Sequence, residues 1–306
     1  MEYSSLEQEA ASHIVHPARD AERSTENIHE SGTANNAHLA YAPIGIFDSG
    51  VGGLTILSAL RQVLPQEDYI YFGDTAHLPY GVRSEEEITG FALQISRFLI
   101  EQGVKLIVVA CNTASQAALN TLRASYTIPF VGVVPAVKPA ARMTRRGRIG
   151  VAATNQAARA AYLRRLIDDF AEGIDVYAVG CPELVTLVEH GELEGTAVEE
   201  TLRQAFEPLL SKGVDVIVLG CTHFPALRPA IERVAGKQVQ VIDSGAAIAR
   251  RVHSLLEAEN SLHPEQESRM GAIQLWCSGE PRSFSKVASR LLGYPVAAQH
   301  ITLPQT

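Results

Sequence analysis

Apolar runs rich in β-branched residues recur along the chain from residue 43 onward. They predict strands at residues 43–48, 69–73, 105–110, 128–134, 148–153, 174–180, 215–220, 239–242 and 272–277. Most of the intervening stretches have apolar residues at helical spacing. Continuous apolar strands that alternate with helices indicate a mostly parallel sheet, buried on both faces. The pattern therefore predicts an α/β protein.

Two local signals predict where helices begin. Ser84 and Glu87 have the spacing of a capping box, in which each side chain accepts a hydrogen bond from the other residue's backbone amide. Pro225 and Pro229 fit the opening turn of a helix that follows Cys221, because proline is tolerated in the first turn.

Two segments 110 residues apart resemble each other. Residues 111–113 (Cys-Asn-Thr) and 221–223 (Cys-Thr-His) each follow an apolar strand, and Gly103 and Ile107 recur as Gly213 and Ile217. The duplication predicts two pseudo-symmetric domains, each a mostly parallel sheet flanked by helices. Such a repeat can set two thiols facing each other, so the active site is expected in the cleft between the domains.

The repeat also divides the chain. We expect residues 43–138 and 244–306 to form the first α/β domain and residues 139–243 the second, with the basic stretch 138–148 as a crossover. Residues 1–42 hold seven acidic residues and two arginines, a net charge of −5, and no long apolar run. We predict that this leader is mostly disordered and that it is not a signal peptide.

Composition narrows the class of protein. The chain has 306 residues, of which 46% are hydrophobic and 20% charged, as is typical of soluble globular proteins. Its net charge of −8 provides no basic surface, so no nucleic acid is expected as a partner. No segment approaches the roughly 20 apolar residues of a membrane helix. A cytoplasmic protein without membrane contact is expected.

The four cysteines favour a reducing compartment. None form a C-x-x-C pair, which argues against a disulfide framework. His223 lies two residues from Cys221, but no second close pair of ligands exists, so no metal site is expected. Cys181 and Cys277 are not followed by two polar residues and are expected to be core residues.

Polar residues gather where the predicted strands end. In open α/β sheets ligands bind at the carboxyl ends of the strands. The residues at these ends are Asp48-Ser49-Gly50, Gly73-Asp74-Thr75 followed by Pro79-Tyr80-Gly81, Cys111-Asn112-Thr113, Thr154-Asn155, Cys181-Pro182 and Cys221-Thr222-His223. Glycines allow close approach of the backbone, and helix N-termini attract carboxylates. A small acidic ligand fits this set.

Paired cysteines suit proton transfer at a carbon atom. A thiolate can act as a base and a thiol as an acid, and a helix N-terminus or a cationic neighbour can lower the pKa of a thiol. Two cysteines on opposite faces of a carbanion would invert its configuration. The chain has no G-x-G-x-x-G fingerprint and no lysine signature for pyridoxal phosphate. Cofactor-free epimerisation of a small acid is one hypothesis, and two buried core cysteines are the other.

Several motifs resemble those of glutamate racemases. These are residues 47–54 (Phe-Asp-Ser-Gly-Val-Gly-Gly-Leu), Asp74 with Pro79-Tyr80-Gly81, residues 109–114 (Val-Ala-Cys-Asn-Thr-Ala) and residues 219–225 (Leu-Gly-Cys-Thr-His-Phe-Pro). Residues 131–142 and 243–251 resemble the Gram-negative branch. Residues 184–191 resemble the segment that supplies a carboxylate in the second half, although Thr186 stands where proline is common.

The resemblance implies a role for each matching residue. Cys111 would be the acid/base residue for D-glutamate and Cys221 the one for L-glutamate. Asp48 would assist Cys111, while His223 and Glu189 would assist Cys221. The implied substrate-binding residues are Asp48, Ser49, Tyr80, Gly81, Asn112, Thr113, Thr222 and His223.

The resemblance also implies a biological setting. The expected enzyme is a cytoplasmic isomerase that supplies D-glutamate for peptidoglycan, and so for cell-wall biogenesis and cell shape. It uses neither pyridoxal phosphate nor metal and is commonly a homodimer. Some Gram-negative members need a UDP-N-acetylmuramoyl-alanine activator.

Two alternatives stay open at this point. The first is an aspartate racemase or another cofactor-independent amino-acid racemase, which turnover of both amino acids would distinguish. The second is a catalytically silent protein that binds an amino acid or regulates another protein. Exchange of the substrate α-proton with solvent deuterium would separate an enzyme from such a binder.

Overall fold

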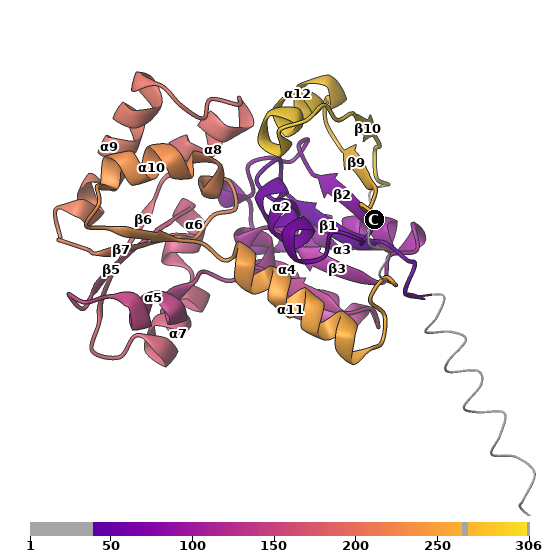
Figure 1. Ribbon diagram of the computed structural model, residues 1–306, viewed down its shortest axis with the longest axis horizontal. Helices are drawn as coiled ribbons and strands as arrows, with labels where there is room; N and C mark the ends of the chain where they lie inside the picture. The colour runs from indigo at the N-terminus through magenta and orange to yellow at the C-terminus, as the bar shows by residue number, and fades with distance from the viewer. Residues whose placement is uncertain (1–38, 265–268, 305–306) are drawn as a thin grey trace, which may run out of the picture.

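The computed structural model describes residues 39–264 and 269–304, which fold into two lobes (Figure 1). Each lobe contains one sheet in which every strand pairing is parallel. The predicted α/β class with two parallel sheets flanked by helices is confirmed. No helix of the described ranges is long and apolar enough to cross a membrane.

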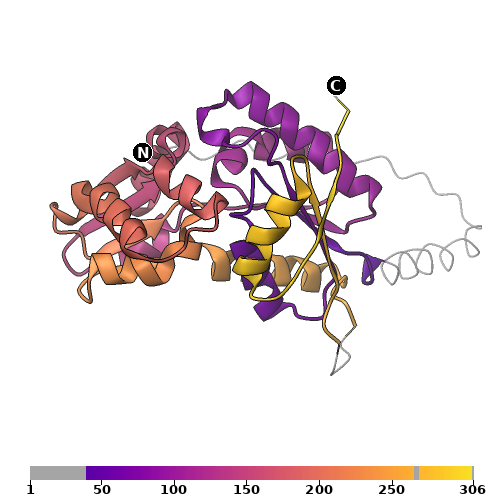
Figure 2. The same ribbon diagram turned by 90° about the horizontal axis from the view of Figure 1, so that it is seen from above.

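The first lobe is built on six strands in the order β10-β9-β2-β1-β3-β4. Their bounds are Ile44–Asp48 for β1, Tyr69–Gly73 for β2, Leu106–Val109 for β3, Phe130–Gly132 for β4, Ile273–Cys277 for β9 and Ala298–His300 for β10. β1, β2 and β3 are buried along their whole length because helices cover both faces. The last two strands return from the second lobe to join this sheet (Figure 2).

The second lobe has four strands in the order β6-β5-β7-β8. Their bounds are Arg148–Ala153 for β5, Asp175–Gly180 for β6, Val216–Leu219 for β7 and Gln240–Ile242 for β8. β5 takes the central place that β1 has in the first lobe, and β7 pairs with it as β3 pairs with β1. The two cysteine-bearing loops therefore leave equivalent strands.

Helices cover both faces of each sheet. In the first lobe they are α2 (Leu54–Val63), α3 (Glu85–Glu101), α4 (Asn112–Ser125), α11 (Gly245–Ala258), α12 (Pro281–Leu292) and the 3₁₀ helix η1 (Tyr80–Val82). In the second lobe they are α5 (Val137–Met143), α6 (Asn155–Arg159), α7 (Ala161–Phe170), α8 (Pro182–Glu189), α9 (Thr196–Leu210), η2 (Phe224–Leu227) and α10 (Arg228–Ala235). Neighbouring strand residues face opposite cores: Ile46 packs with α2 and α11, and Phe47 with α3 and α4.

The chain crosses between the lobes twice, before α5 and before α11. The Ser244 hydroxyl on the second crossing donates to the Val134 carbonyl on the first. Ala136 and Val137, at the start of α5, already pack with the second sheet. The domain limits given above stay a prediction. Of the predicted leader, residues 1–38 lie outside the described residues, while Ala40 is buried and its carbonyl accepts a hydrogen bond from Lys105.

Local expectations hold with two exceptions. Every predicted strand is present, and Ser84 and Glu87 form the capping box. β10 was not predicted, because this strand has only three residues, is largely exposed and contains no apolar run. The single helix expected after Cys221 is wrong: a turn leads into η2 and then α10, each with a proline in its first turn.

Candidate active site

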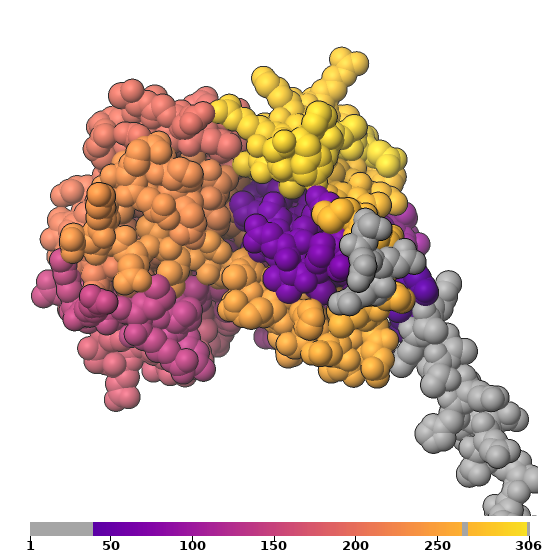
Figure 3. Space-filling view, viewed as in Figure 1, coloured from indigo at the N-terminus to yellow at the C-terminus, as the bar shows by residue number. Residues whose placement is uncertain are grey.

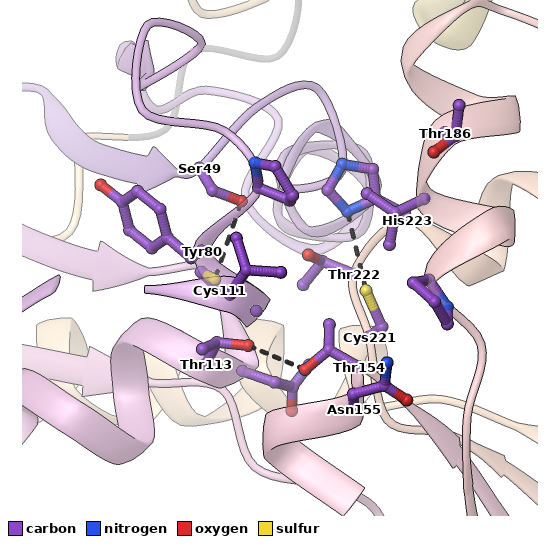
Figure 4. Close-up of a pocket in the computed structure, with 16 residues that line it drawn as sticks. Ser49, Tyr80, Cys111, Thr113, Thr154, Asn155, Thr186, Cys221, Thr222 and His223 are labelled. Carbon is purple, nitrogen blue, oxygen red and sulfur yellow. Dashed lines mark hydrogen bonds between the residues drawn. The ribbon is translucent and has the colours of Figure 1, made fainter. Parts of the chain in front are cut away.

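Loops from the carboxyl ends of both sheets enclose a cavity of about 120 Å³ between the lobes (Figure 4). Its size suits a small molecule, since pockets for drug-sized ligands start at about 300 Å³. The lining residues are Ser49, Pro79, Tyr80, Gly81, Val82, Cys111, Asn112, Thr113, Thr154, Asn155, Pro182, Val185, Thr186, Cys221, Thr222 and His223. The lobes are in contact on the face shown in Figure 3.

Cys111 ends the loop after β3 and caps α4. Its sulfur accepts a hydrogen bond from the Ala114 amide at 3.4 Å and lies 4.0 Å from the Ser49 hydroxyl. Burial raises the pKa of the Cys111 thiol well above its usual value, the neighbouring Asp48 raises it further, and the Ala114 amide only partly opposes them. The helix N-terminus therefore does not lower the pKa of this thiol overall.

Asp48 lies behind the cavity at the end of β1 and is fully buried. Its carboxylate accepts hydrogen bonds from the Gly53 amide at 2.6 Å and, across the lobes, from the Thr222 hydroxyl at 3.4 Å. Burial raises the pKa of Asp48, while the charge of His223 and the Gly53 amide act in the opposite direction. A carboxyl group with a raised pKa is closer to a thiol in proton affinity, which suits proton exchange with Cys111.

Cys221 has a different partner. Its sulfur lies 3.7 Å from His223 Nδ1, and His223 Nε2 lies 2.6 Å from Glu189 Oε1. Burial alone would lower the pKa of His223, but the hydrogen bonds to Cys221 and Glu189 outweigh it and hold the pKa well above its usual value. Glu189, on α8, also accepts a hydrogen bond from the Val51 amide of the first lobe at 2.8 Å. The imidazole can therefore take the proton of Cys221 and be stabilised as a cation.

Two glycines explain the sequence of the loop after β1. A Cβ atom on Gly50 would lie 2.0 Å from Glu189 Oε1, and one on Gly52 would lie 2.3 Å from His223 Nδ1. Any side chain at either position would collide with the hydrogen-bonded pair of Glu189 and His223. The glycines are thus required by close contact between the lobes rather than by unusual backbone angles.

The predicted residues fall into two groups. Ser49, Tyr80, Gly81, Asn112, Thr113, Thr222 and His223 line the cavity together with both cysteines, while Asp48 and Glu189 lie behind it as hydrogen-bond partners. The buried Asn112 Oδ1 has no hydrogen-bond partner in the described part of the chain. The Tyr80 hydroxyl points away from the sulfurs and donates to Asp74, so the ring and backbone of Tyr80 form the cavity wall (Figure 4).

Several lining residues were not among the predicted site residues. Thr154, Asn155 and Pro182 stand at predicted strand ends, and the Thr154 hydroxyl lies 3.3 Å from that of Thr113 across the lobes. Val185 and Thr186 precede Glu189 by one helical turn, a spacing that places them on its side of α8. Helical periodicity applied from Glu189 would have identified both.

Among the residues that the structure describes, no lysine or arginine lines the cavity. The N-termini of α4 and α8, which begin at Asn112 and Pro182 beside the two halves of the site, can attract a carboxylate. Hydroxyls and a side-chain amide complete the wall. Across residues 39–264 and 269–304, no cluster of three or more His, Cys, Asp or Glu side chains could hold a metal ion.

Comparison with known proteins assigns the family. Residues 54–252 match the model of the Asp/Glu/Hydantoin racemase family. The chain belongs to this family. It is 46% identical over 245 residues to a glutamate racemase of Herpetosiphon aurantiacus, an alignment that covers 80% of this chain and 96% of that one.

Solved structures of the racemase family are also similar to the chain. A glutamate racemase isoform from Bacillus anthracis has a TM-score of 0.77 and 34% identity, and covers 87% of this chain and 100% of its own. Escherichia coli glutamate racemase, in complex with L-glutamate and the activator UDP-MurNAc-Ala, has a TM-score of 0.76 and 35% identity. The match covers 86% of this chain and 99% of that chain. The similarity extends over both lobes.

Proposed function

We propose that the protein interconverts L- and D-glutamate by proton transfer between the substrate α-carbon and two cysteines. The observation that carries the proposal is the placement of Cys111 and Cys221 in one small cavity, on loops from opposite lobes, each with its own proton partner. Membership of the racemase family and the similarity to glutamate racemases support the choice of substrate.

In the direction from L- to D-glutamate, Cys221 acts as the base. Its proton passes to His223, whose cationic form Glu189 stabilises. The thiolate then removes the α-proton, and the electron pair of the C–H bond remains on the substrate as a carbanion. Cys111, whose raised pKa keeps it protonated, donates its proton to the opposite face.

In the reverse direction the two thiols exchange tasks. Cys111 must lose its proton first, and Asp48 is the nearby base with a raised pKa that can receive it. The Cys111 thiolate then removes the α-proton of D-glutamate, and the thiol of Cys221 reprotonates the other face. Each turnover leaves the donating cysteine as a thiolate and one extra proton on the partner of the base, His223 or Asp48. Exchange of protons with solvent then restores the starting distribution.

The cavity offers complementary groups for an amino acid. The free carbonyl oxygen of Asn112 can accept a hydrogen bond from the α-ammonium group. The two carboxylates can bind hydroxyls and backbone amides of the remaining lining residues that the sequence predicted, namely Ser49, Tyr80, Gly81, Thr113, Thr222 and His223. Helix N-termini and hydroxyls thus take the place of a lysine or an arginine.

A circular-dichroism assay with each enantiomer tests this function. We expect L- and D-glutamate each to lose their signal completely, and aspartate to be turned over far more slowly. Turnover of aspartate at an equal rate would instead favour the broader racemase alternative. Absence of α-proton exchange with solvent deuterium would identify a binding protein.

A second cavity, of about 600 Å³, lies at the crossings between the lobes and is a proposed site for an activator such as UDP-N-acetylmuramoyl-alanine. Its lining combines the aromatic rings of Phe130, Tyr162 and Phe170 with four cationic side chains, those of Arg123, Lys138, Arg250 and Arg251. Cations suit a diphosphate, and apolar rings suit a nucleobase. The single acidic residue of the lining, Asp243, is paired with Arg228, so its charge is compensated.

Calorimetric titration with the nucleotide tests the activator site. We expect Lys138→Ala to weaken binding about tenfold, since a charge-assisted hydrogen bond contributes roughly 1.5–3 kcal/mol. Arg282→Ala, an exposed position on α12, serves as the control and should bind like the wild type. Equal affinity in all three proteins, or no binding, would refute this placement.

The wider setting is carried over from the family resemblance. We propose a cytoplasmic homodimer that supplies D-glutamate for peptidoglycan. Light scattering would test the dimer, cell fractionation the location, and complementation of a strain that requires D-glutamate the role in the cell wall.

A further inference from the structure

Tyr80 forms part of the active-site wall, but its hydroxyl serves another residue. The hydroxyl donates to Asp74 Oδ2 at 2.6 Å and points away from the two sulfurs (Figure 4). Burial and the neighbouring Asp74 both raise the pKa of the Tyr80 phenol well above its usual value, so it stays a donor. The Tyr80 ring therefore lines the cavity, while its hydroxyl is held by Asp74 on the side away from the cavity.

Asp74 accepts hydrogen bonds from its own loop and from one distant part of the chain. It follows β2 and is 2% exposed. The Ser278 hydroxyl, just after β9, donates to Asp74 Oδ1 at 2.6 Å, and His77 Nδ1 lies 2.8 Å from the same oxygen. Ser278 in turn accepts a hydrogen bond from the Ala76 amide at 3.0 Å. The carboxylate thus joins Tyr80 to the C-terminal strand pair.

The same loop is held at further points. The Gly279 amide donates to the Thr75 hydroxyl at 3.0 Å, and the His77 ring stacks on Phe91 with centroids 4.0 Å apart. Four successive residues that follow, Pro79, Tyr80, Gly81 and Val82, line the active-site cavity. Asp74 itself does not line it. Its direct contact with the site is therefore through this wall.

We propose that Asp74 is a positioning residue for substrate binding, which fixes the wall formed by residues 79–82 through the Tyr80 hydroxyl and is itself held by Ser278. The inference rests on the proposed racemase function. Because Asp74 is outside the cavity, its loss should weaken the binding of glutamate and leave the proton transfers at the α-carbon unchanged.

A double-mutant cycle tests the proposal with Tyr80→Phe, Asp74→Asn and the combined variant. Each single variant should raise the KM of both enantiomers and the calorimetric Kd of L-glutamate roughly tenfold, as expected for one hydrogen bond to a charged group. kcat and the α-deuterium isotope effect should stay at wild-type values. The combined variant should have the same KM as Asp74→Asn alone, because Asp74→Asn already removes the hydrogen bond between the Tyr80 hydroxyl and the carboxylate.

Two further variants serve as controls. Tyr126→Phe removes an equivalent hydroxyl that donates to the Leu93 carbonyl at 3.1 Å, remote from the cavity, and should leave KM unchanged. Ser278→Ala should change KM in the same direction as Asp74→Asn but less, because His77 still contacts the carboxylate. Melting temperatures identify any variant that fails to fold, and Tyr80→Phe, which removes one atom, keeps the test valid if Asp74→Asn does fail.

The outcomes separate this proposal from the function it rests on. Multiplicative effects in the combined variant, an altered isotope effect in Asp74→Asn, or wild-type KM in Tyr80→Phe would overturn the positioning role while the wild type still racemises glutamate. A wild type that binds glutamate without turnover would refute the racemase function. The double-mutant cycle of Tyr80 and Asp74 would then be evaluated from the Kd of L-glutamate in each variant. A wild type that does neither would overturn both.

Discussion

The two halves of the active site have the same strand arrangement but different ionisable residues beside their cysteines. Cys111 and Cys221 both follow the strand next to the central one, and both are 6% exposed. Cys111 lies beside the buried carboxyl of Asp48, which makes its ionisation harder. Cys221 lies beside an imidazole that a carboxylate supports. The repeat thus provides two equivalent positions, where a carboxyl group raises the pKa of one thiol and a histidine lies beside the other.

The difference follows from what comes after each cysteine. Cys111 is the N-cap of α4, a helix of 14 residues that begins directly after it. Cys221 leads into a turn, which brings His223 back to the sulfur before η2 begins. One carboxylate beside each cysteine's site is also held from the opposite lobe: Asp48 by the Thr222 hydroxyl, and Glu189, the partner of His223, by the Val51 amide. Proton partners in both halves therefore depend on contact between the lobes.

The largest expected effect comes from removing either sulfur. Cys111→Ala and Cys221→Ala should each lower racemisation in both directions by at least about 10³-fold, because each direction needs one thiol as base and the other as acid. Cys277→Ala, another buried cysteine, is the control and should remain active. Near-normal racemisation by either active-site variant, with an unchanged melting temperature, would end the two-base account.

The assignment of partners predicts a smaller, directional effect. His223→Asn should change the α-deuterium isotope effect with L-glutamate more than with D-glutamate, and Asp48→Asn should do the reverse. Since enantiomers have equal free energies, kcat/KM must fall equally in both directions, and the asymmetry can appear only in kcat and KM separately or in isotope effects. Equal changes for both enantiomers in both variants would reject the partners and leave the racemase function standing.

Glu189→Gln sharpens the comparison through pH. The amide can keep a hydrogen bond to His223 but removes the charge that helps raise the pKa of His223. With a lower pKa, the imidazolium loses its proton at lower pH, so the acidic limb of kcat/KM should move to lower pH. The loss of activity at the optimum should be about tenfold. An unshifted limb would show that Glu189 does not support His223 during turnover.

The smallest effect is expected from the N-terminal leader. The alignment with the Herpetosiphon aurantiacus relative covers 80% of this chain but 96% of that one, and residues 1–42 carry no motif of the site. Deleting residues 1–38 should leave the melting temperature and basal activity within experimental error. Insoluble protein would show that the leader belongs to the core, whereas loss of the activator response alone would give it a regulatory role.

Sequence periodicity was sufficient for most of the fold. Buried strands such as β1 and β2 are continuous apolar runs, so the pattern reports them directly. β10 escaped because an edge strand of three residues buries little and needs no apolar run. The break between η2 and α10 escaped because proline at a helix start is equally compatible with one helix or two.

The part of the site that consists of residues at strand ends was predictable from local sequence motifs. The strand-end residues identified both cysteines and most of the lining. The interaction of Glu189 with His223 depends on packing of α8 against a loop, which no local pattern encodes. The direction of the Tyr80 hydroxyl likewise depends on Asp74, which is held by Ser278, a residue distant in sequence. Net pKa directions depend on burial, which outweighs the helix N-terminus at Cys111.

The most direct test of the central claim is deuterium incorporation during the first turnovers in D₂O. Starting from L-glutamate, Cys221 removes the α-proton and Cys111 delivers a deuteron to the opposite face. We therefore predict that the D-glutamate formed carries deuterium at its α-carbon while the remaining L-glutamate does not, and the mirror result from D-glutamate. Early deuterium in the remaining substrate at the same rate as in product would mean that one group serves both faces, and would contradict the account.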